Sequence, residues 1–175
     1  MPIPTPVEKR ALGARNPLPR LRRQIRRHVG RLSLGLQIYV LLVVMRGIIT
    51  VMPLRRIGER LGERRAETPS DGLRPEQLLY AKRVGRGIRR IAPLTPTNSN
   101  CYPQALTAWW LLRRRGIPTT FYYGAAFNEE GTALQAHTWL RCGPLVVTGG
   151  GTHLLRFPPL IWFADHARTA RRGAR

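Results

Sequence analysis

With 175 residues, 43% of them hydrophobic, the chain suits one folded domain with a buried core and, at most, a helical extension. The net charge of +21 predicts attraction to polyanions such as nucleic acid, anionic lipid or an acidic peptide; a solvated basic surface with disordered basic ends is the alternative. Two cysteines exclude a disulfide framework, and no secretory signal is visible, so we expect a reducing cytoplasm.

Residues 1–31 form a basic N-terminal segment with two parts. Residues 1–17 are rich in proline and basic side chains, and we expect this part to be disordered. From Leu18 to Leu32, apolar residues recur at spacings of three and four with arginines between them, which predicts a basic amphipathic helix. Such a helix docks on the domain or lies on an anionic membrane surface, so membrane association is the alternative to a purely cytoplasmic protein.

Residues 32–66 are predicted to form a helical extension. The stretch from Leu36 to Met52 is almost entirely apolar and stops at Pro53, which predicts a helix. A membrane span needs about 20 apolar residues, and Arg46 in its middle costs about 2.5 kcal/mol or more on insertion scales. A buried or partly buried helix is therefore favoured over a span, and a short basic helix follows at Leu54–Leu61.

Residues 67–165 have the pattern of an α+β core, in which helices come first and a small antiparallel sheet follows. One helix is predicted from Pro75 to the prolines at 93 and 96, and another from Cys101 to Gly116. β-Branched and aromatic residues then predict strands at Thr119–Phe127, Leu134–Arg141 and Leu145–Thr148. Consecutive glycines end the sheet, and residues 166–175 form a basic tail.

Cys101 stands where a polar loop ends and an apolar helix begins. The unpaired N–H groups and the dipole at a helix start favour thiolate over thiol, which is the form a nucleophile needs. His137 follows on a predicted strand, so its imidazole could take the thiol proton and later protonate a leaving amine, as in papain-like cysteine peptidases. The alternatives are an unreactive buried cysteine and a histidine that only packs.

Neither a metal nor a cofactor is expected. Cys101, Cys142, His137 and His153 are the residues that could supply zinc ligands. No two of them have the close spacing that is typical of zinc sites, so a zinc site is disfavoured.

Several motifs resemble those of the lasso-peptide leader peptidases, which are bacterial transglutaminase-like proteins related to the C-terminal-type domain of the microcin-processing protein. The resemblance covers residues 32–160 and rests on Cys101-Tyr-Pro-Gln-Ala-Leu, Leu111-Leu-Arg-Arg-Arg-Gly-Ile-Pro118 and Ala136-His-Thr-Trp-Leu140. It implies a papain/transglutaminase-like cysteine peptidase fold with an N-terminal helical extension and a small antiparallel sheet. It also implies two catalytic residues, with Cys101 as the nucleophile and His137 as the base.

The resemblance further implies that the protein removes the leader from a ribosomally synthesised lasso-peptide precursor. A separate leader-recognition protein would present the precursor peptide, and an asparagine-synthetase-like cyclase would then close the ring. Acyl transfer by the same Cys–His pair and a catalytically silent peptide- or polyanion-binding protein are the alternatives. Stacking aromatic residues do not alternate with the basic ones, so no specific nucleic-acid partner is expected.

The chain departs from the family at the residue that orients the histidine. The family usually has an acidic residue about a dozen positions after the histidine, whereas residues 145–152 contain none. Thr148, Asp165 or a backbone carbonyl could take its place. Alternation along the strand puts His137, Trp139 and Arg141 on one face, and residues 147–150 are the nearest acceptors by chain order.

The oxyanion of a reaction intermediate would be held at the start of the same helix. The backbone N–H of Cys101 is the first candidate, helped by Asn98 or Asn100. The alternative role for these two asparagines is helix capping and turn formation.

Overall fold

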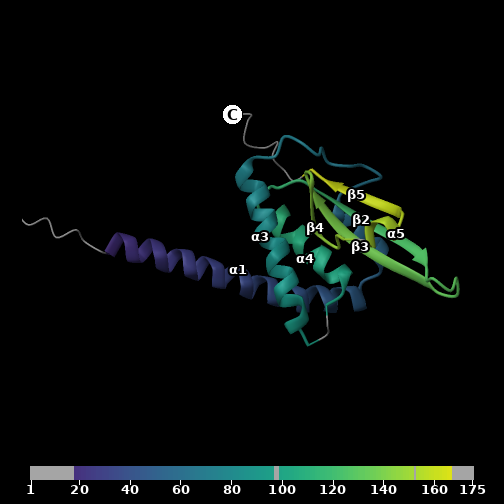
Figure 1. Cartoon of the computed structure of the whole chain (residues 1–175), viewed down its shortest axis with the longest axis horizontal. Helices are drawn as coiled ribbons and strands as arrows, with labels where there is room; N and C mark the ends of the chain where they lie inside the picture. The colour runs from purple at the N-terminus through teal and green to yellow at the C-terminus, as the bar shows by residue number, and fades with distance from the viewer. Residues whose placement is uncertain (1–17, 97–98, 152, 167–175) are drawn as a thin grey trace, which may run out of the picture. The chain divides into compact units, whose positions relative to one another are not determined.

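The computed structural model of the chain describes residues 18–96, 99–151 and 153–166. The predictions for residues 1–17 and 167–175 lie outside these residues. The chain divides into two units after Leu32, and the side chains of helix α1 (Leu18–Val51) are described from Ser33 onward. The larger unit, residues 33–175, contains every other helix and strand that the structure describes (Figure 1).

The helices of this unit begin and end at the proline and glycine signals in the sequence. Pro75 is the first residue of α3, a position where a backbone N–H would have no acceptor within the helix, so the missing N–H of proline costs nothing. The Gln77 side chain accepts a hydrogen bond from the Arg74 N–H at 2.9 Å. After α4 the chain leaves the helix through Gly116, which has a left-handed φ of 65°. These helices are α2 (Leu54–Leu61), α3 (Pro75–Ile91), the 3-10 helix η1 (Ala92–Leu94), α4 (Cys101–Arg113) and α5 (His153–Arg156).

The sheet is antiparallel, with five strands in the order β1-β5-β2-β3-β4, which confirms the α+β prediction. In the β2–β3 hairpin, Tyr122 lies opposite Trp139 and Gly124 opposite His137. The pattern did not predict β5, because its apolar run does not alternate and its partner β2 is distant in sequence. The strands are β1 (Glu63–Arg64), β2 (Thr119–Phe127), β3 (Leu134–Cys142), β4 (Leu145–Thr148) and β5 (Pro159–Asp165).

The two faces of the sheet have different partners. Helices α3 and α4 lie against one face (Figure 1), where Phe121 and Leu140 are almost fully buried in the main core. On the other face, the Tyr122 and Trp139 rings stack with their centroids 5.1 Å apart and cluster with Phe157. Alternation along β3 therefore sends the side chain of His137 to the face away from α4.

Arg141 ties the linker before α3 to the sheet. Its guanidinium donates to Tyr122 Oη at 3.1 Å, to Thr68 O at 2.7 Å and to Glu67 Oε2 at 3.0 Å. Thr68 in turn donates its N–H to Thr120 Oγ1 at 3.0 Å. Because Thr68 and Thr120 are buried, these bonds satisfy polar atoms that water does not reach. The network holds the linker against the strand that also carries the predicted base.

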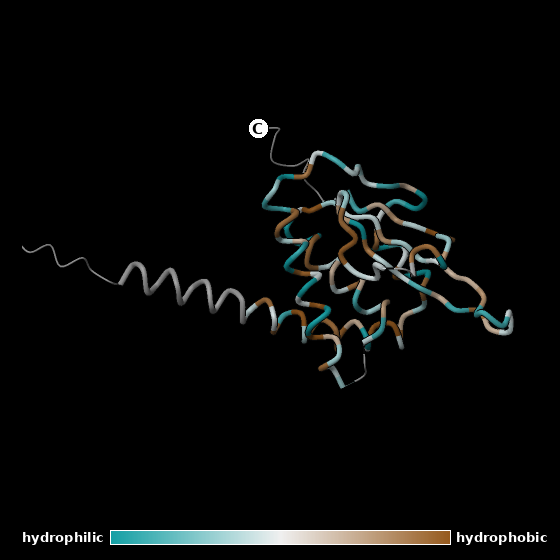
Figure 2. The backbone as a smooth tube through the Cα atoms, viewed as in Figure 1, coloured by the Kyte–Doolittle hydropathy of each residue, from teal (hydrophilic) through white to brown (hydrophobic). Residues whose placement is uncertain are grey.

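One side of α1 belongs to the core. Ile38 and Leu42 are fully buried, and the Ile38 side chain lies over Gly87 of α3. The stretch Ser33–Val51 has a mean hydropathy of 2.0 and could cross a membrane by length and composition, but 22% of it is buried. Figure 2 shows this apolar run along the described part of α1. The result agrees with the prediction of a partly buried helix, because a span would strip Ile38 and Leu42 from the core.

Gly85 lets α3 approach β4 closely, which generates a prediction for stability. A Cβ at Gly85 would lie 2.5 Å from the Val147 carbonyl oxygen, which belongs to the backbone and cannot rotate away. We expect Gly85→Ala to lower the free energy of unfolding by about 1–3 kcal/mol, measured by urea denaturation.

The matched control for this substitution is Gly47→Ala. Gly47 also lies in a helix, but nothing lies within 4 Å of its added Cβ. Alanine should therefore stabilise by up to about 1 kcal/mol through helix propensity. Equal effects of the two substitutions would contradict the close approach at Gly85.

Candidate active site

Cys101 is the first residue of α4, as predicted, and its thiol is partly exposed. The loop before it is pinned by hydrogen bonds: Thr95 Oγ1 donates to Ala92 O at 2.7 Å and lies 2.9 Å from Ser99 Oγ. The Gln104 side chain, one turn into the helix, donates to Ser99 O at 2.7 Å. The backbone in front of the thiol is therefore held from both sides.

Two contacts place Cys101 along the strands. Next to Cys101, the Tyr102 ring meets Tyr123 of β2 edge-on with the centroids 6.1 Å apart. At the other end of α4, Arg113 Nη1 lies 3.4 Å from Asp165 Oδ2, and Asp165 pairs with Thr119 at the start of β2. The helix therefore runs antiparallel to β2, and the Tyr102 ring lies over the stretch from Phe121 to Tyr123.

The predicted base lies next to this stretch of the hairpin. Tyr123 pairs with Thr138, and the next residue of β2, Gly124, pairs with His137. Tyr102 therefore contacts the hairpin one residue pair away from His137, although the two residues belong to segments separated by a helix and a strand.

His137 is oriented by a backbone carbonyl. Its Nε2 lies 2.8 Å from Gly149 O, just beyond the end of β4. A carbonyl only accepts, so Nε2 carries the proton, and in the neutral ring Nδ1 is the basic nitrogen. The ring also packs beside Trp139 and Phe157, with centroid distances of 6.0 and 5.3 Å. These contacts fix both the ring plane and the tautomer.

The thiol and the imidazole start from opposite faces of the sheet. Tyr102 packs on the face that carries Phe121, whereas His137 shares the other face with Trp139. β4 ends at Thr148, before it reaches the level of His137, so β3 is an edge strand there on that side. A proton transfer between the two groups would have to pass around this edge of β3.

Neither of the two side chains predicted to orient His137, Asp165 and Thr148, makes the observed contact with its Nε2, which is with Gly149 O. Asp165 lies opposite Thr119, whereas His137 lies opposite Gly124. These positions on β2 are five residues apart, or about 17 Å at the rise of a strand. Asp165 does fold back onto the sheet, but at the wrong end, where it pairs with Arg113.

Thr148 lies next to the observed acceptor but points elsewhere. It is opposite Leu140 and shares the α4 face of the sheet. Its hydroxyl has no hydrogen-bond partner within the part of the chain that the structure describes. Of the three predicted alternatives, the backbone carbonyl is therefore the one that meets the ring.

The candidates for the oxyanion are only partly described. Asn98 lies outside the described residues. Asn100 is the N-cap residue of α4 and is exposed, and its side chain makes no capping bond. At the first turn of a helix the backbone N–H groups have no intrahelical acceptor, which leaves the Cys101 N–H as the candidate with a physical basis.

The second cysteine has a different environment. Cys142 is fully buried in the main core, and this burial raises the pKa of its thiol to about 11. Among the described residues, no three histidine, cysteine or acidic side chains gather where they could hold a metal ion.

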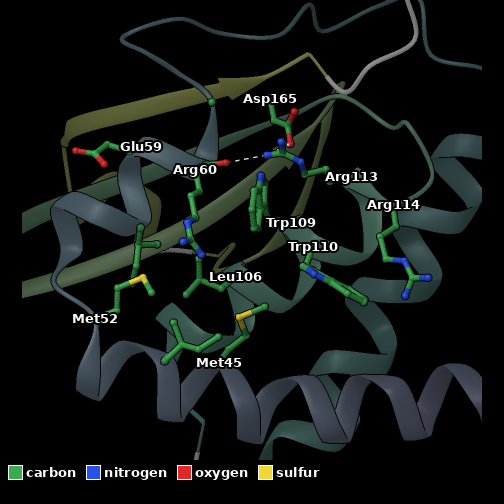
Figure 3. A pocket seen from close by; sticks show the side chains of 13 residues that line it. Met45, Met52, Glu59, Arg60, Leu106, Trp109, Trp110, Arg113, Arg114 and Asp165 are labelled. Atoms are coloured by element: carbon green, nitrogen blue, oxygen red, sulfur yellow. Dashed lines mark hydrogen bonds and ion pairs between the residues drawn. The ribbon is translucent and has the colours of Figure 1, made fainter. Parts of the chain in front are cut away.

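A cavity of about 900 Å³ lies at the other end of α4 (Figure 3). Met45 of α1, Met52 just after α1 and Trp109 of α4 form apolar walls, and Arg113 donates to Arg60 O at 2.7 Å. Asp165 also lines it, so this carboxylate belongs to the cavity and not to the Cys101 site.

Sequence reasoning did not single out Gly149, Phe157 or Gln104. A backbone carbonyl leaves no residue-type signal, although residues 147–150 were the expected region. Phe157 meets His137 only through a contact made in the folded chain. Gln104 did offer a signal, because its side chain lies one turn after Cys101 and can reach back to the preceding loop.

A helix that begins at a cysteine and packs on an antiparallel sheet carrying a histidine defines the papain- and transglutaminase-like class of α+β proteins. The transglutaminase-like superfamily model matches residues 45–161, and the chain belongs to this family. Membership suggests cysteine peptidase or acyltransferase-like activity. No curated protein and no solved structure gives a significant match.

The two thiols should differ sharply in reactivity. At pH 8 the raised pKa of about 11 keeps Cys142 protonated, and no part of its side chain is exposed. We expect iodoacetamide to modify Cys101 at least about a hundredfold faster, measured by peptide mass spectrometry over time. In guanidinium chloride the two rates should converge. Rapid modification of Cys142 in the folded protein would contradict this assignment.

Proposed function

We propose that the protein is a cysteine peptidase that removes the leader from a lasso-peptide precursor. The observation that carries the proposal is the 2.8 Å hydrogen bond between His137 Nε2 and Gly149 O. It supplies the acceptor that the acidic residue provides in the resembling peptidases. Membership of the transglutaminase-like superfamily and the place of Cys101 at the start of α4 support the same activity.

The proposed reaction begins with transfer of the thiol proton of Cys101 to His137 Nδ1. The sulfur attacks the carbonyl carbon of the scissile peptide bond, and the Cys101 N–H stabilises the resulting oxyanion. The C–N bond breaks as His137 returns the proton to the leaving amine of the core peptide. Water then gives a proton to His137 and attacks the thioester carbon. The C–S bond breaks, His137 returns the proton to the sulfur, and the leader leaves with a free carboxylate.

The Gly149 carbonyl has a defined role in this sequence. It holds the ring in the tautomer that leaves Nδ1 basic, and its dipole stabilises the imidazolium that forms after proton transfer. A carbonyl carries only a partial charge, so this stabilisation is weaker than that from a carboxylate.

The proposed partners follow from the family resemblance. They are the precursor peptide, a separate leader-recognition protein and an asparagine-synthetase-like cyclase that acts on the released core. Acyl transfer is the second candidate, because an amine could replace water in the attack on the same thioester. The form of the released leader separates the two reactions, since hydrolysis leaves a free carboxylate and transfer leaves an amide.

Replacing the nucleophile should abolish leader cleavage. We expect Cys101→Ala to lower cleavage more than about a thousandfold, since no other group at the start of α4 can form the thioester. Cleavage is measured by mass spectrometry with a lasso-peptide precursor and a leader-recognition protein.

Cys142→Ala is the matched control, because Cys142 is the other cysteine and lies in the core. It should retain cleavage provided that circular dichroism shows a folded protein. Full cleavage by Cys101→Ala would sink the peptidase proposal.

The carbonyl assignment predicts which neighbours are dispensable. Thr148→Val and Asp165→Asn should keep cleavage within about twofold, whereas His137→Ala should lower it at least about a hundredfold. The Thr148 hydroxyl has no partner among the described residues, and Asp165 pairs with Arg113 at the far end of α4. A folded Asp165→Asn protein as inactive as His137→Ala would show that the orienting group is misassigned.

A further inference from the structure

Helix α1 has an apolar face that the described part of the protein leaves uncovered. Opposite the buried side chains of Ile38 and Leu42, a second row of aliphatic side chains faces outward. Their exposed fractions run from 41% to 83%, which is unusual for so many neighbouring aliphatic residues. We call this row the outer face of α1: Leu36, Val40, Val43, Val44 and Val51.

The residues of the outer face follow helical spacing. Leu36, Val40, Val43, Val44 and Val51 are separated by steps of three, four or seven, apart from the adjacent pair at 43 and 44, and therefore form one stripe. A helix that is apolar on all sides is normally surrounded by protein or lipid. Since the core covers only the Ile38 side of α1, we expect the outer face to contact a second apolar environment.

The charges around the outer face select the kind of environment. Residues 33–54 contain no acidic side chain, and Arg46 is their one cation. The sequence on both flanks is rich in arginine, with Arg55 and Arg56 exposed just beyond Pro53. A second copy of the chain would bring another net charge of +21 to the contact, which is unfavourable. An anionic lipid surface offers both an apolar layer and negative headgroups.

The depth of contact follows from the core packing. Ile38, Leu42 and Met45 are buried in the main core, so α1 cannot cross a bilayer without unpacking. An interfacial helix needs only one face in the lipid, at a depth of about 5–10 Å. This is the geometry that the two-sided α1 allows.

We propose that the outer face of α1 is a membrane-docking surface, with α1 lying in the interface of an anionic bilayer and its Ile38 side still in the core. The bound protein is monotopic, and Cys101 at the start of α4 and His137 on the sheet stay in the aqueous phase. This inference is independent of the proposed peptidase activity.

The experiment measures binding of the full chain to sedimented vesicles. The purified protein is mixed with vesicles of phosphatidylglycerol and phosphatidylcholine, or of phosphatidylcholine alone. The test variant is Val40→Glu/Val44→Glu, which places two carboxylates on the outer face. Its matched control is Leu79→Glu/Leu160→Glu, which makes the same charge change at residues of similar exposure on α3 and β5.

We expect the parent to bind the anionic vesicles and to bind neutral ones more weakly. The test variant should lose at least about tenfold in affinity, and the control should lose much less. The charge-neutral variant Val40→Ser/Val44→Ser should also lose affinity, which separates the apolar contact from electrostatic attraction. It also tests the proposal if the glutamate variant fails to fold, which thermal unfolding would show.

Three outcomes would overturn the proposal. One is a parent protein that does not bind anionic vesicles. Another is equal loss in the test and control variants, which would mean that net charge alone drives binding. The third is a parent that sediments as a dimer without lipid while Val40→Ser/Val44→Ser is a monomer, since the outer face would then be covered by a second copy.

Discussion

The placement of α4 across β2 and β3 decides where the thiol lies, and the geometry of the site depends on it. Tyr102 against Tyr123 anchors the start of the helix, and Arg113 with Asp165 anchors its end. Burial raises the pKa of Tyr102, so this ring stays neutral and acts through packing. A shift of α4 by one turn would move Cys101 by about 5.4 Å, which is more than a hydrogen bond can span.

The use of a carbonyl in place of a carboxylate has structural consequences. A side-chain acid can be lost by one substitution, whereas the Gly149 carbonyl depends only on the backbone path after β4. That path needs glycine, because Gly149 has a φ of 71° and an added Cβ would lie 2.3 Å from the Thr138 carbonyl oxygen. The glycines after Thr148 therefore do more than end the sheet: they bring an acceptor to His137.

The two faces of the sheet are stabilised by different kinds of contact. The α4 face supplies most of the buried apolar area, while the other face is organised by ring stacking and by the Arg141 network. Helix α1 adds to the first face only through its inner row of side chains. Within the described residues, an apolar surface on α1 is left uncovered. The Cys101 and His137 segments are held by contacts that do not involve that surface.

Local signals in the sequence determined α2, α3, α4 and the two stretches that together form α1, three of the strands and the position of Cys101 at a helix start. Proline and glycine mark these boundaries within a few residues, and alternation along β3 placed His137 and Trp139 on one face. Only the tertiary structure decided that β5 pairs with β2, that Asp165 lies at the far end of α4, and that Gly149 O meets His137. These three features depend on pairing between segments distant in sequence and on the positions of backbone atoms. The residue types within a short stretch of sequence indicate neither.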